Sequence, residues 1–313
     1  MKPKVFIDGS EGTTGLQIYD RLASRGDIDL LQIEHLKRKD ISERKKLINA
    51  ADLVFLCLPD DAARESVQLI ENDSTRVIDA STAHRISNGW VYGLSELSQK
   101  QKENIKKAKR VSNPGCHSTG AILLLTPLIE AGFIPKDYPV VITSVTGYTG
   151  GGKNMINLYE TPGSMLSSEL HAPRLYATSA SHKHIPEIVK YTGLNLTPIL
   201  IPIVSDYPQG IQIIIPLSFP QEKVNIRNEM FETLTKHYNR CSNITVCDES
   251  PSFAASNVNA QSDKVTLKVL GFDEKVILTA QFDNLGKGAS GAAVQNMNIM
   301  LGFDEYRGLK IGV

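Results

Sequence analysis

The first 80 residues alternate short apolar runs with amphipathic stretches, and this order limits the fold more than any other feature. The clearest run is Leu53–Leu58, which is apolar throughout and ends at Pro59. Such a run is typical of a parallel strand that is buried on both faces. Further strands are expected at 5–7, 29–33 and 76–79, and helices at 16–22, 41–50 (capped by Asp40 or Ser42) and 60–70 (capped by Asp60). The alternation predicts an α/β domain with a Rossmann-type, doubly wound parallel sheet.

The pattern changes near Val140, where strand-like runs become dominant. These runs are 140–145, 197–204, 210–217, 265–270 and 275–282. They predict a second α+β domain with a mostly antiparallel sheet. A helix of small residues near the end, followed by Gly302, is expected to pack back on the first domain. The expected boundaries are residues 1–116, completed by the C-terminal helix 286–313, for the first domain and 117–285 for the second.

Composition excludes several classes of protein. The 313 residues contain 34 Lys plus Arg and 34 Asp plus Glu, so the zero net charge gives no support for binding nucleic acid or an anionic membrane. The apolar runs are too short for a membrane span, and the one at the N-terminus is too short for a signal peptide. Four cysteines without a disulfide-like or zinc-like spacing fit a reducing cytosol, so a cytoplasmic protein is expected.

A glycine-rich turn follows the first strand and opens the first helix. Its glycines are Gly9, Gly12 and Gly15, with Ser10 and Thr13 between them. Closely spaced glycines let the backbone approach a phosphate, which the helix N-terminus attracts. The spacing is GxxGxxG rather than GxGxxG, and a turn without a ligand is the alternative. Glu34 favours a ribose 2′-hydroxyl and the triplet 37–39 (Lys-Arg-Lys) favours a 2′-phosphate, so the residues favour NADP over NAD only weakly.

Cys116 follows the turn Pro114-Gly115 and begins the apolar helical pattern 121–129. A helix N-terminus carries unpaired N–H groups and a partial positive charge, which favour the thiolate. Asn113 and three residues after the cysteine are polar. We therefore predict a nucleophile at Cys116, the alternative being a buried, inert thiol such as the one expected at Cys57.

Two histidines, His182 and His184, flank a lysine in the segment SHKHIPE. A cysteine nucleophile needs an acid/base nearby, and histidine titrates in the required range. Metal binding is a competing reading, although the sequence shows no third ligand and no metal is expected. The other alternative is that the two histidines have no catalytic role and belong to a polar surface before a helix that begins at Pro186.

Three more segments are candidate sites for anions or the cofactor. Ser81, Thr82 and Arg85 follow the fourth strand, where ligands bind in sheets of this type, and Arg85 offers a bidentate fork. The glycine-dense segment 146–153 ends at Lys153 and is interpreted as a site loop. The segment 283–290 is expected to cap the terminal helix and to approach the cofactor.

Nearly the whole chain resembles the short-form N-acetyl-γ-glutamyl-phosphate reductases of arginine biosynthesis. The resemblance is carried by GSEGTTGLQIYDRL, VFLCLPDDAARE, DASTAHR, WVYGLSEL, NPGC with Thr119-Gly120, SVTGYTGGGK, SHKHIPE and FDNLGKGASGAAVQN. The family usually has an aromatic residue after the cysteine, often followed by proline, where this chain has His117-Ser118. The residues from Tyr176 to Ser181 are also atypical.

The resemblance implies NADPH-dependent reduction of an acyl phosphate to an aldehyde, with release of inorganic phosphate through a cysteine thioester. It implies Cys116 as nucleophile and His182 or His184 as acid/base, and it leaves the choice between the histidines open. It places Arg85, Asn113 and Lys153 near the substrate. For the cofactor it implies Gly9, Ser10, Gly12, Thr13, Gly15, Ser81, Asn284 and Gly286. It also implies a homo-oligomer, a dimer or tetramer, joined through the second domain's sheet.

Three alternative functions remain. Another phosphorylating semialdehyde dehydrogenase, such as one acting on aspartyl phosphate, would share the cysteine, the histidine and the cofactor turn. A non-catalytic NADP-binding regulator would keep the fold, but the retained cysteine and histidines argue against it. A Cys-His hydrolase without a cofactor is disfavoured by the glycine turn.

Overall fold

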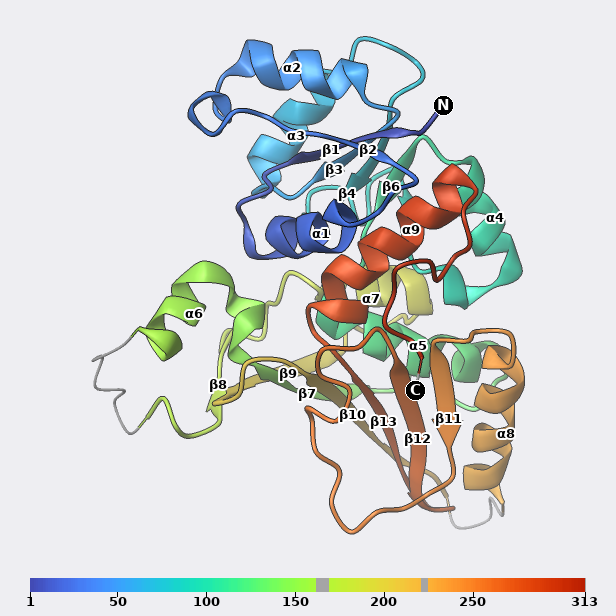
Figure 1. Ribbon diagram of the computed structural model, residues 1–313. Coiled ribbons are helices and arrows are strands. Elements are labelled where there is room, and N and C mark those ends of the chain that lie inside the picture. The colour runs from blue at the N-terminus through green and yellow to red at the C-terminus, as the bar shows by residue number, and fades with distance from the viewer. Residues whose placement is uncertain (162–168, 221–224, 313) are drawn as a thin grey trace. The chain divides into compact units, whose positions relative to one another are not determined.

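The computed structural model describes residues 1–161, 169–220 and 225–312 and has two compact units (Figure 1). The first unit contains residues 1–114 and 289–309, and the second contains 115–288 and the chain from Lys310 onward. Two of the three crossings between the units lie two and three residues from the expected domain boundaries, and the third, between residues 309 and 310, was not expected. The last residues belong to the second unit, where Asp263 and Lys310 exchange backbone and side-chain hydrogen bonds.

A six-stranded sheet forms the centre of the first unit, in the order β2-β1-β3-β4-β6-β5, and all of its pairings are parallel. Its strands are β1 (Lys4–Asp8), β2 (Asp29–Leu31), β3 (Leu53–Leu56), β4 (Arg76–Asp79), β5 (Val91–Tyr92) and β6 (Arg110–Ser112). The helices are α1 (Thr13–Ala23), α2 (Ile41–Ala50), α3 (Asp60–Gln68), α4 (Gln99–Lys107) and α9 (Gly291–Leu301), with short 3-10 turns at His35–Lys37 and Ser95–Leu97. The predicted Rossmann-type sheet is therefore confirmed.

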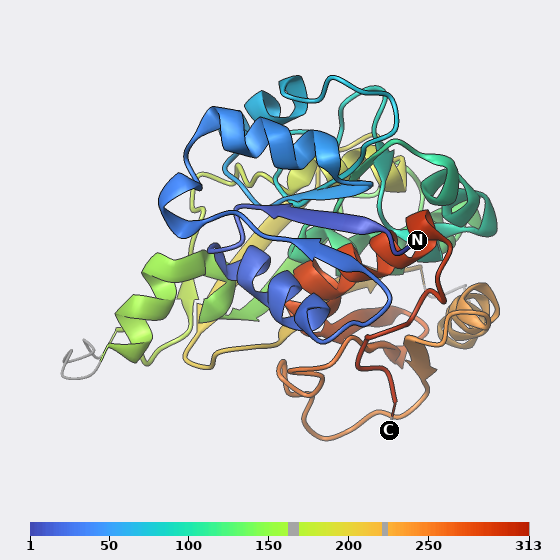
Figure 2. The same cartoon turned by 45° about the horizontal axis from the view of Figure 1, so that its top comes forward.

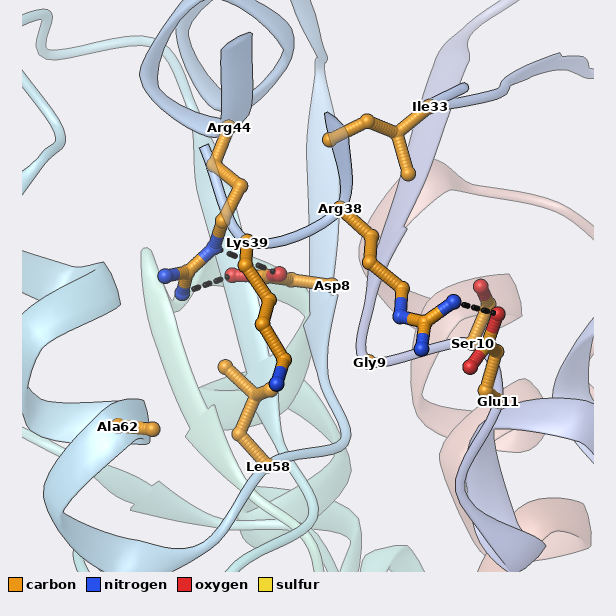
Figure 3. Close-up of a pocket in the computed structure, with 10 residues that line it drawn as sticks. All are labelled: Asp8, Gly9, Ser10, Glu11, Ile33, Arg38, Lys39, Arg44, Leu58 and Ala62. Atoms are coloured by element: carbon orange, nitrogen blue, oxygen red, sulfur yellow. Dashed lines mark hydrogen bonds and ion pairs between the residues drawn. The ribbon is translucent and has the colours of Figure 1, made fainter. Parts of the chain in front are cut away.

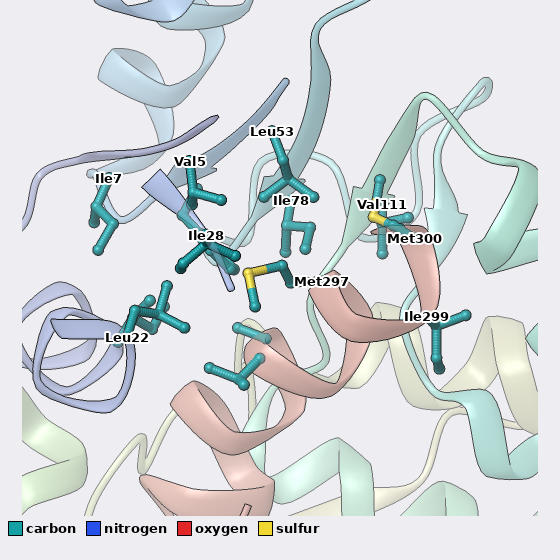
Figure 4. Close-up of a cluster of buried hydrophobic side chains, with 14 of the residues drawn as sticks. Val5, Ile7, Leu22, Ile28, Leu53, Ile78, Val111, Met297, Ile299 and Met300 are labelled. Carbon is teal, nitrogen blue, oxygen red and sulfur yellow. The ribbon is translucent and has the colours of Figure 1, made fainter. Parts of the chain in front are cut away.

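Helices cover both faces of this sheet (Figure 2), and an apolar layer of side chains lies between the helices and the strands on each face. On one face, side chains of α1 and α9, such as Leu22 and Met297, pack against Val5 and Leu53 of the strands (Figure 4). On the other face, α2 and α3 supply Ile48 and Ala63. Because both faces are covered, β3 is buried at every residue, as its continuous apolar run predicts. Because the strands are parallel, the turns that follow β1, β3, β4 and β6 all lie at the carboxyl edge of the sheet.

The helix starts show one correct and one wrong prediction. The carboxylate of Asp40 accepts hydrogen bonds from the backbone N–H groups of Ser42 and Glu43, so Asp40 is the N-cap of α2. Asp60 was expected to cap α3, but the N-cap is Pro59. The carboxylate of Asp60 instead accepts hydrogen bonds from the backbone and the hydroxyl of Thr82, because the loop after β4 passes close to it.

The second unit contains a seven-stranded mixed sheet in the order β11-β12-β13-β10-β7-β9-β8. Its strands are β7 (Val141–Gly147), β8 (Arg174–Leu175), β9 (Ile199–Ser205), β10 (Ile211–Ser218), β11 (Ile244–Cys247), β12 (Val265–Phe272) and β13 (Lys275–Phe282). Four of the six pairings are antiparallel, while β7–β9 and β11–β12 are parallel. The expected α+β sheet is confirmed.

Helices cover one face of this second sheet. They are α5 (Cys116–Glu130), α7 (Ile185–Thr192) and α8 (Ile226–Tyr238), while α6 (Gly152–Glu160) follows a 3-10 turn at Tyr148–Gly151 (Figure 1). A Cβ atom at Gly120 would lie 2.5 Å from the side chain of Ile213 and 2.8 Å from that of Phe282. Glycine at this residue therefore lets α5 lie directly on β10 and β13. Within the described ranges, no helix is long and apolar enough to cross a membrane.

Candidate active site

Cys116 is the first residue of α5, directly after the N-cap Gly115, which has no side chain to cap the helix. Every residue from His117 to Ile129 is buried, so the core of the unit fixes the helix, whereas Cys116 itself is half-buried. The hydroxyls of Ser118 and Thr119 both donate to the carbonyl of Gly115 and hold the turn. The thiol thus lies at the positive end of a rigid helix, where a thiolate is favoured.

Three histidines lie next to this thiol. The ring centroids of His182 and His184 are 4.7 Å apart, and they lie 5.1 and 5.2 Å from the ring of His117. The sulfur of Cys116 and one nitrogen each from His117 and His184 all lie within 4.8 Å of one another. The structure therefore brings together the predicted nucleophile and both predicted acid/base candidates, and it adds His117.

His117 is buried between two hydroxyl groups. Its Nδ1 lies 2.6 Å from Oγ of Ser144, and its Nε2 lies 2.7 Å from the hydroxyl of Tyr176. Burial, with smaller contributions from His182 and Lys183, lowers the pKa of His117 to about 3. His117 is therefore neutral near pH 7 and cannot supply a proton as an imidazolium. Burial, and then the charge of Cys116, raise the pKa of Tyr176, so its hydroxyl keeps its proton.

The segment that carries His182 and His184 is joined directly to the turn before Cys116. Glu187, a buried residue of α7, accepts a hydrogen bond of 3.2 Å from the backbone N–H of Gly115. The backbone N–H of His184 donates to Nδ1 of His182 over 3.2 Å. No role for Glu187, Ser144 or Tyr176 was expected from the sequence, although the segment SHKHIPE contains the glutamate.

Gly288 also lies against the nucleophile. A Cβ atom there would lie 2.9 Å from Cβ of Cys116, so a larger residue would press on the thiol. Gly288 belongs to a π-helical turn, Gly286–Ser290, that precedes α9. The carboxylate of Asp283 accepts hydrogen bonds from the backbone N–H groups of Leu285 and Gly286 and fixes the start of this turn.

Three other predicted site residues also lie in the second unit. The amide of Asn284 accepts from the backbone N–H of Gly210 and donates to Oγ1 of Thr149, so it joins two loops. A Cβ atom at Gly286 would lie 2.3 Å from a backbone oxygen, which explains the glycine. Lys153 is exposed and lies in the first turn of α6, so the expected loop is instead a 3-10 turn that leads into a helix, and a substrate role for Lys153 stays a prediction.

The glycine turn after β1 is tightly packed in the first unit. Gly9 has a φ of 88°, and a Cβ atom there would lie 2.4 Å from the carbonyl oxygen of Cys57. A Cβ atom at Gly15 would lie 2.3 Å from the carbonyl oxygen of Gly9. Gly12 is the N-cap of α1, and Thr13 is the first residue of the helix. Backbone alone thus forms the approach to this helix N-terminus, as binding of a dinucleotide phosphate requires.

A cavity of about 300 Å³ lies beside this turn (Figure 3). It is lined by Asp8, Gly9, Ser10, Glu11, Ile33, Arg38, Lys39, Arg44, Leu58 and Ala62. Arg44 pairs with the carboxylate of Asp8 through Nε and Nη2, and Arg38 pairs with Glu11 over 3.0 Å. Glu34 does not line the cavity, because its carboxylate pairs with Lys37 over 2.9 Å. The lining holds three cationic and two acidic side chains, and the two arginines pair with the two carboxylates, so Lys39 supplies the excess positive charge that a 2′-phosphate would need.

The remaining predicted residues follow β4 and β6. The backbone and hydroxyl of Ser81 both donate to the carboxylate of Asp79. The buried guanidinium of Arg85 donates from Nε to the carbonyl oxygen of Asn113 over 3.0 Å. The amide of Asn113 donates to the carbonyl oxygen of Ala289 and accepts from the amide of Asn296. Ser81, Arg85 and Asn113 thus hold the carboxyl edge of the sheet together, and their contacts with ligands stay predictions.

Cys57, which was expected to be a buried and inert thiol, is half-buried. It directly follows β3, where burial, and then Asp79 and Asp8, raise its pKa strongly. A thiol in that environment stays protonated and unreactive.

Comparison with known proteins gives the family. The model of the semialdehyde dehydrogenase NAD binding domain matches residues 4–107, and that of the semialdehyde dehydrogenase dimerisation domain matches residues 116–284. The chain is 47% identical over 307 residues to N-acetyl-gamma-glutamyl-phosphate reductase 2 of Pseudomonas putida, covering 96% of this chain and 97% of that protein. It is 45% identical to N-acetyl-gamma-glutamyl-phosphate reductase of Chelativorans sp., covering 96% and 99%.

Solved structures show the same fold at much lower identity. Aspartate semialdehyde dehydrogenase II of Vibrio cholerae, complexed with ASA, superposes with a TM-score of 0.71 at 14% identity, covering 96% of this chain and 98% of that one. The aspartate semialdehyde dehydrogenase of Francisella tularensis gives a TM-score of 0.69 at 14% identity, covering 96% and 100%. The two family models cover both units, and the curated relatives are up to 47% identical over nearly the whole chain. This chain therefore belongs to the N-acetyl-γ-glutamyl-phosphate reductases, within the semialdehyde dehydrogenase family.

Proposed function

We propose that this protein reduces N-acetyl-γ-glutamyl phosphate to N-acetylglutamate 5-semialdehyde with NADPH and releases inorganic phosphate, as a step of arginine biosynthesis. The observation that carries the proposal is the thiol of Cys116 at the N-terminus of α5, with a nitrogen of His184 within 4.8 Å of its sulfur. Two relatives that are named for this reaction are 47% and 45% identical to this chain.

In the first step, the thiolate of Cys116 attacks the acyl phosphate carbonyl. The S–C bond forms and the C–O bond to phosphate breaks, so inorganic phosphate leaves and a thioester remains on Cys116. The backbone N–H of Cys116, at the helix N-terminus, stabilises the developing oxyanion. Gly288 leaves room for the acyl group, because a side chain there would press on Cβ of Cys116.

In the second step, the thioester is reduced and the aldehyde is released. NADPH, held by the glycine turn of Gly9, Gly12 and Gly15, would supply the hydride that reduces the thioester carbonyl carbon. His184 donates a proton to the carbonyl oxygen to give a hemithioacetal. His184 then takes the hydroxyl proton back as the S–C bond breaks, which releases the aldehyde and restores the thiolate. We assign this role to His184 because its nitrogen is near the sulfur, whereas Nδ1 of His182 receives a backbone hydrogen bond.

NADP is the cofactor, and we assign its phosphates to two parts of the first unit. The pyrophosphate is assigned to the turn of Gly9, Ser10, Gly12, Thr13 and Gly15. The 2′-phosphate is assigned to Arg38 and Lys39 in the cavity beside that turn. Ser81, Asn284 and Gly286 complete the proposed set, and Arg85, Asn113 and Lys153 remain the proposed substrate residues.

The 2′-phosphate assignment predicts the effect of one lysine. Lys39→Ala is expected to raise the KM for NADPH by about 10- to 100-fold, because a charge-assisted hydrogen bond contributes about 1.5–3 kcal/mol. The KM for NADH should not change. Lys37→Ala is the matched control, since it removes the same charge from a side chain that pairs with Glu34 outside the cavity. Equal effects of the two substitutions, or an equal effect on NADH, would contradict the assignment.

The protein forms a homo-oligomer, and we assign the subunit contact to the second sheet's face opposite the helices. Thr143, Ile201 and Ile214 lie side by side in the strand register there and are each half-buried. Ile199, Pro216 and Ile277 are exposed on the same face. An apolar sheet face of this kind fits a second copy of the chain, as a dimer or tetramer.

This assignment predicts a change of molecular mass. A charge at Ile201 would be buried without a partner in the proposed contact, so Ile201→Asp is expected to shift the protein towards its 34.4 kDa monomer. Light scattering coupled to size-exclusion chromatography measures this shift. Leu36→Asp, at an 88% exposed residue of the first unit, should leave the mass unchanged. An Ile201→Asp variant with the mass of the parent protein would place the contact elsewhere.

The substrate assignment is tested by NADP⁺ reduction with N-acetylglutamate semialdehyde, with and without phosphate. Phosphate-dependent turnover of this aldehyde, and none of aspartate semialdehyde, is the expected result. Turnover of aspartate semialdehyde alone would make the protein the other kind of phosphorylating dehydrogenase. Binding of NADPH without turnover of either aldehyde would favour the regulator.

A further inference from the structure

We propose that Cys116, His117 and His184 form a binding site for Zn²⁺, and that the bound ion covers the thiolate and stops the enzyme. The three donor atoms lie within 4.8 Å of one another, although His184 is far from the other two in the sequence. His117 and His184 are buried, with 3% and 5% of their surfaces exposed, and Cys116 is half-buried. The cluster is therefore enclosed by protein rather than spread on a surface.

The donor set is the one that zinc prefers. Zinc sites use thiolate sulfur and imidazole nitrogen, and three protein ligands with a water molecule in the fourth position are common. Bond lengths of about 2.3 Å to sulfur and about 2.0–2.1 Å to nitrogen place tetrahedral donors roughly 3.4–3.6 Å apart. The observed upper limit of 4.8 Å therefore requires the donors to approach one another by no more than roughly 1.4 Å.

His117 is already oriented for such a role. A histidine ligand usually donates its second ring N–H to an oxygen, which fixes the other nitrogen towards the metal. Oγ of Ser144 lies 2.6 Å from Nδ1 of His117 and can accept that hydrogen bond. Nε2 then presents its lone pair to the hydroxyl of Tyr176, 2.7 Å away. We assign Nε2 as the ligand atom, so the ion would take the place of the Tyr176 hydroxyl there.

His117 is the third ligand of the proposed site, and a hydrocarbon ring in its place would offer no lone pair to a metal. Without His117, the two remaining ligands, Cys116 and His184, make only a weak site.

Binding would also inhibit the proposed reaction. The thiol of Cys116 would lose its proton to solvent and form a Zn–S bond, so its lone pair would no longer be available for attack. His184 would likewise use its nitrogen lone pair for the metal. The inhibition rests on the proposed function, whereas the binding itself does not.

The binding test uses metal-free protein titrated with Zn²⁺ by calorimetry, and with Co²⁺ by absorption spectroscopy. One ion per chain is expected, with a cobalt–thiolate band that Cys116→Ser removes. His117→Phe should weaken binding by about 100-fold or more, because loss even of a residue that only supports a ligand costs about 10- to 100-fold. His171→Phe is the matched control, since His171 is exposed and pairs with Asp206. His117→Gln replaces the phenylalanine variant if that variant does not fold.

The outcomes separate the metal site from the proposed reaction. Inhibition by Zn²⁺ that a chelator reverses, and protection of Cys116 from alkylation by iodoacetamide, are expected. Suppose that Zn²⁺ binds the parent protein but not His117→Phe, and that the parent protein has no reductase activity. This result would support the metal site and refute the proposed function. Equal binding by the His117 and His171 variants would overturn the site, and activity that requires Zn²⁺ would overturn its inhibitory role.

Discussion

Cys116→Ser is expected to lower turnover by at least about 10⁴-fold, a loss comparable to that seen when a nucleophile is removed from other enzymes. Serine nearly matches cysteine in size, but its hydroxyl does not ionise near pH 7, even at a helix N-terminus. NADPH binding should be unchanged, because the glycine turn and the cationic cavity belong to the first unit. Fluorescence titration of NADPH, together with steady-state kinetics, measures both quantities.

The control for this substitution is Cys247→Ser. Cys247 is a half-buried cysteine at the end of β11 in the same unit, so the substitution makes the same chemical change outside the cluster. It should retain most of the activity. Substantial turnover by Cys116→Ser, beyond what contaminating parent enzyme supplies, would remove Cys116 as the nucleophile.

His184→Asn is expected to lower kcat by about 10²- to 10⁴-fold, the usual contribution of a positioned acid/base. The KM should change little, because the proposed role is proton transfer rather than binding. The pH dependence of kcat should also lose the limb that reports the histidine. His117 does not supply that limb, since its pKa of about 3 keeps it neutral throughout the neutral range.

His182→Asn is the comparison that decides between the two histidines. Its smaller expected effect follows from geometry: Nδ1 of His182 accepts a hydrogen bond from the backbone N–H of His184 and so orients its neighbour. If His182→Asn lost the pH limb while His184→Asn kept it, the roles would be reversed.

The sequence predicted most of the first unit, because local signals agree there. The buried run at β3, the glycine turn before α1 and the cap at Asp40 each depend on neighbouring residues, and the structure has all three. The start of α5 at Cys116 was predictable for the same reason. The prediction that Asp60 caps α3 was wrong because its carboxylate binds Thr82, 22 residues away, instead of the N-terminus of the helix.

The surroundings of Cys116 were not predictable from local patterns. Ser144 and Tyr176 contact His117 from 27 and 59 residues away, and Glu187 contacts Gly115 from 72 residues away. The packing of α5, α7, β7 and the segment after β8 in one unit brings these side chains together. For the same reason the sequence showed no third ligand beside His182 and His184, while the structure places Cys116 and His117 there.

The loop predicted before Lys153 was wrong because the prediction relied on the glycine content of the segment. Glycine disfavours helices, so a dense run of glycines usually indicates a loop. Here Gly147 approaches the backbone of Tyr207 and Pro208 so closely that a Cβ atom would lie 2.5–2.6 Å from their oxygens. This close packing fixes the glycines in a compact turn, and α6 begins immediately after it.

The most direct measurement is mass spectrometry of the enzyme after incubation with N-acetylglutamate semialdehyde and NADP⁺ in the absence of phosphate. The account predicts one N-acetylglutamyl thioester per chain, on the peptide that contains Cys116, and its disappearance when phosphate is added. An adduct on another residue, or turnover with no adduct on Cys116, would contradict the thioester mechanism.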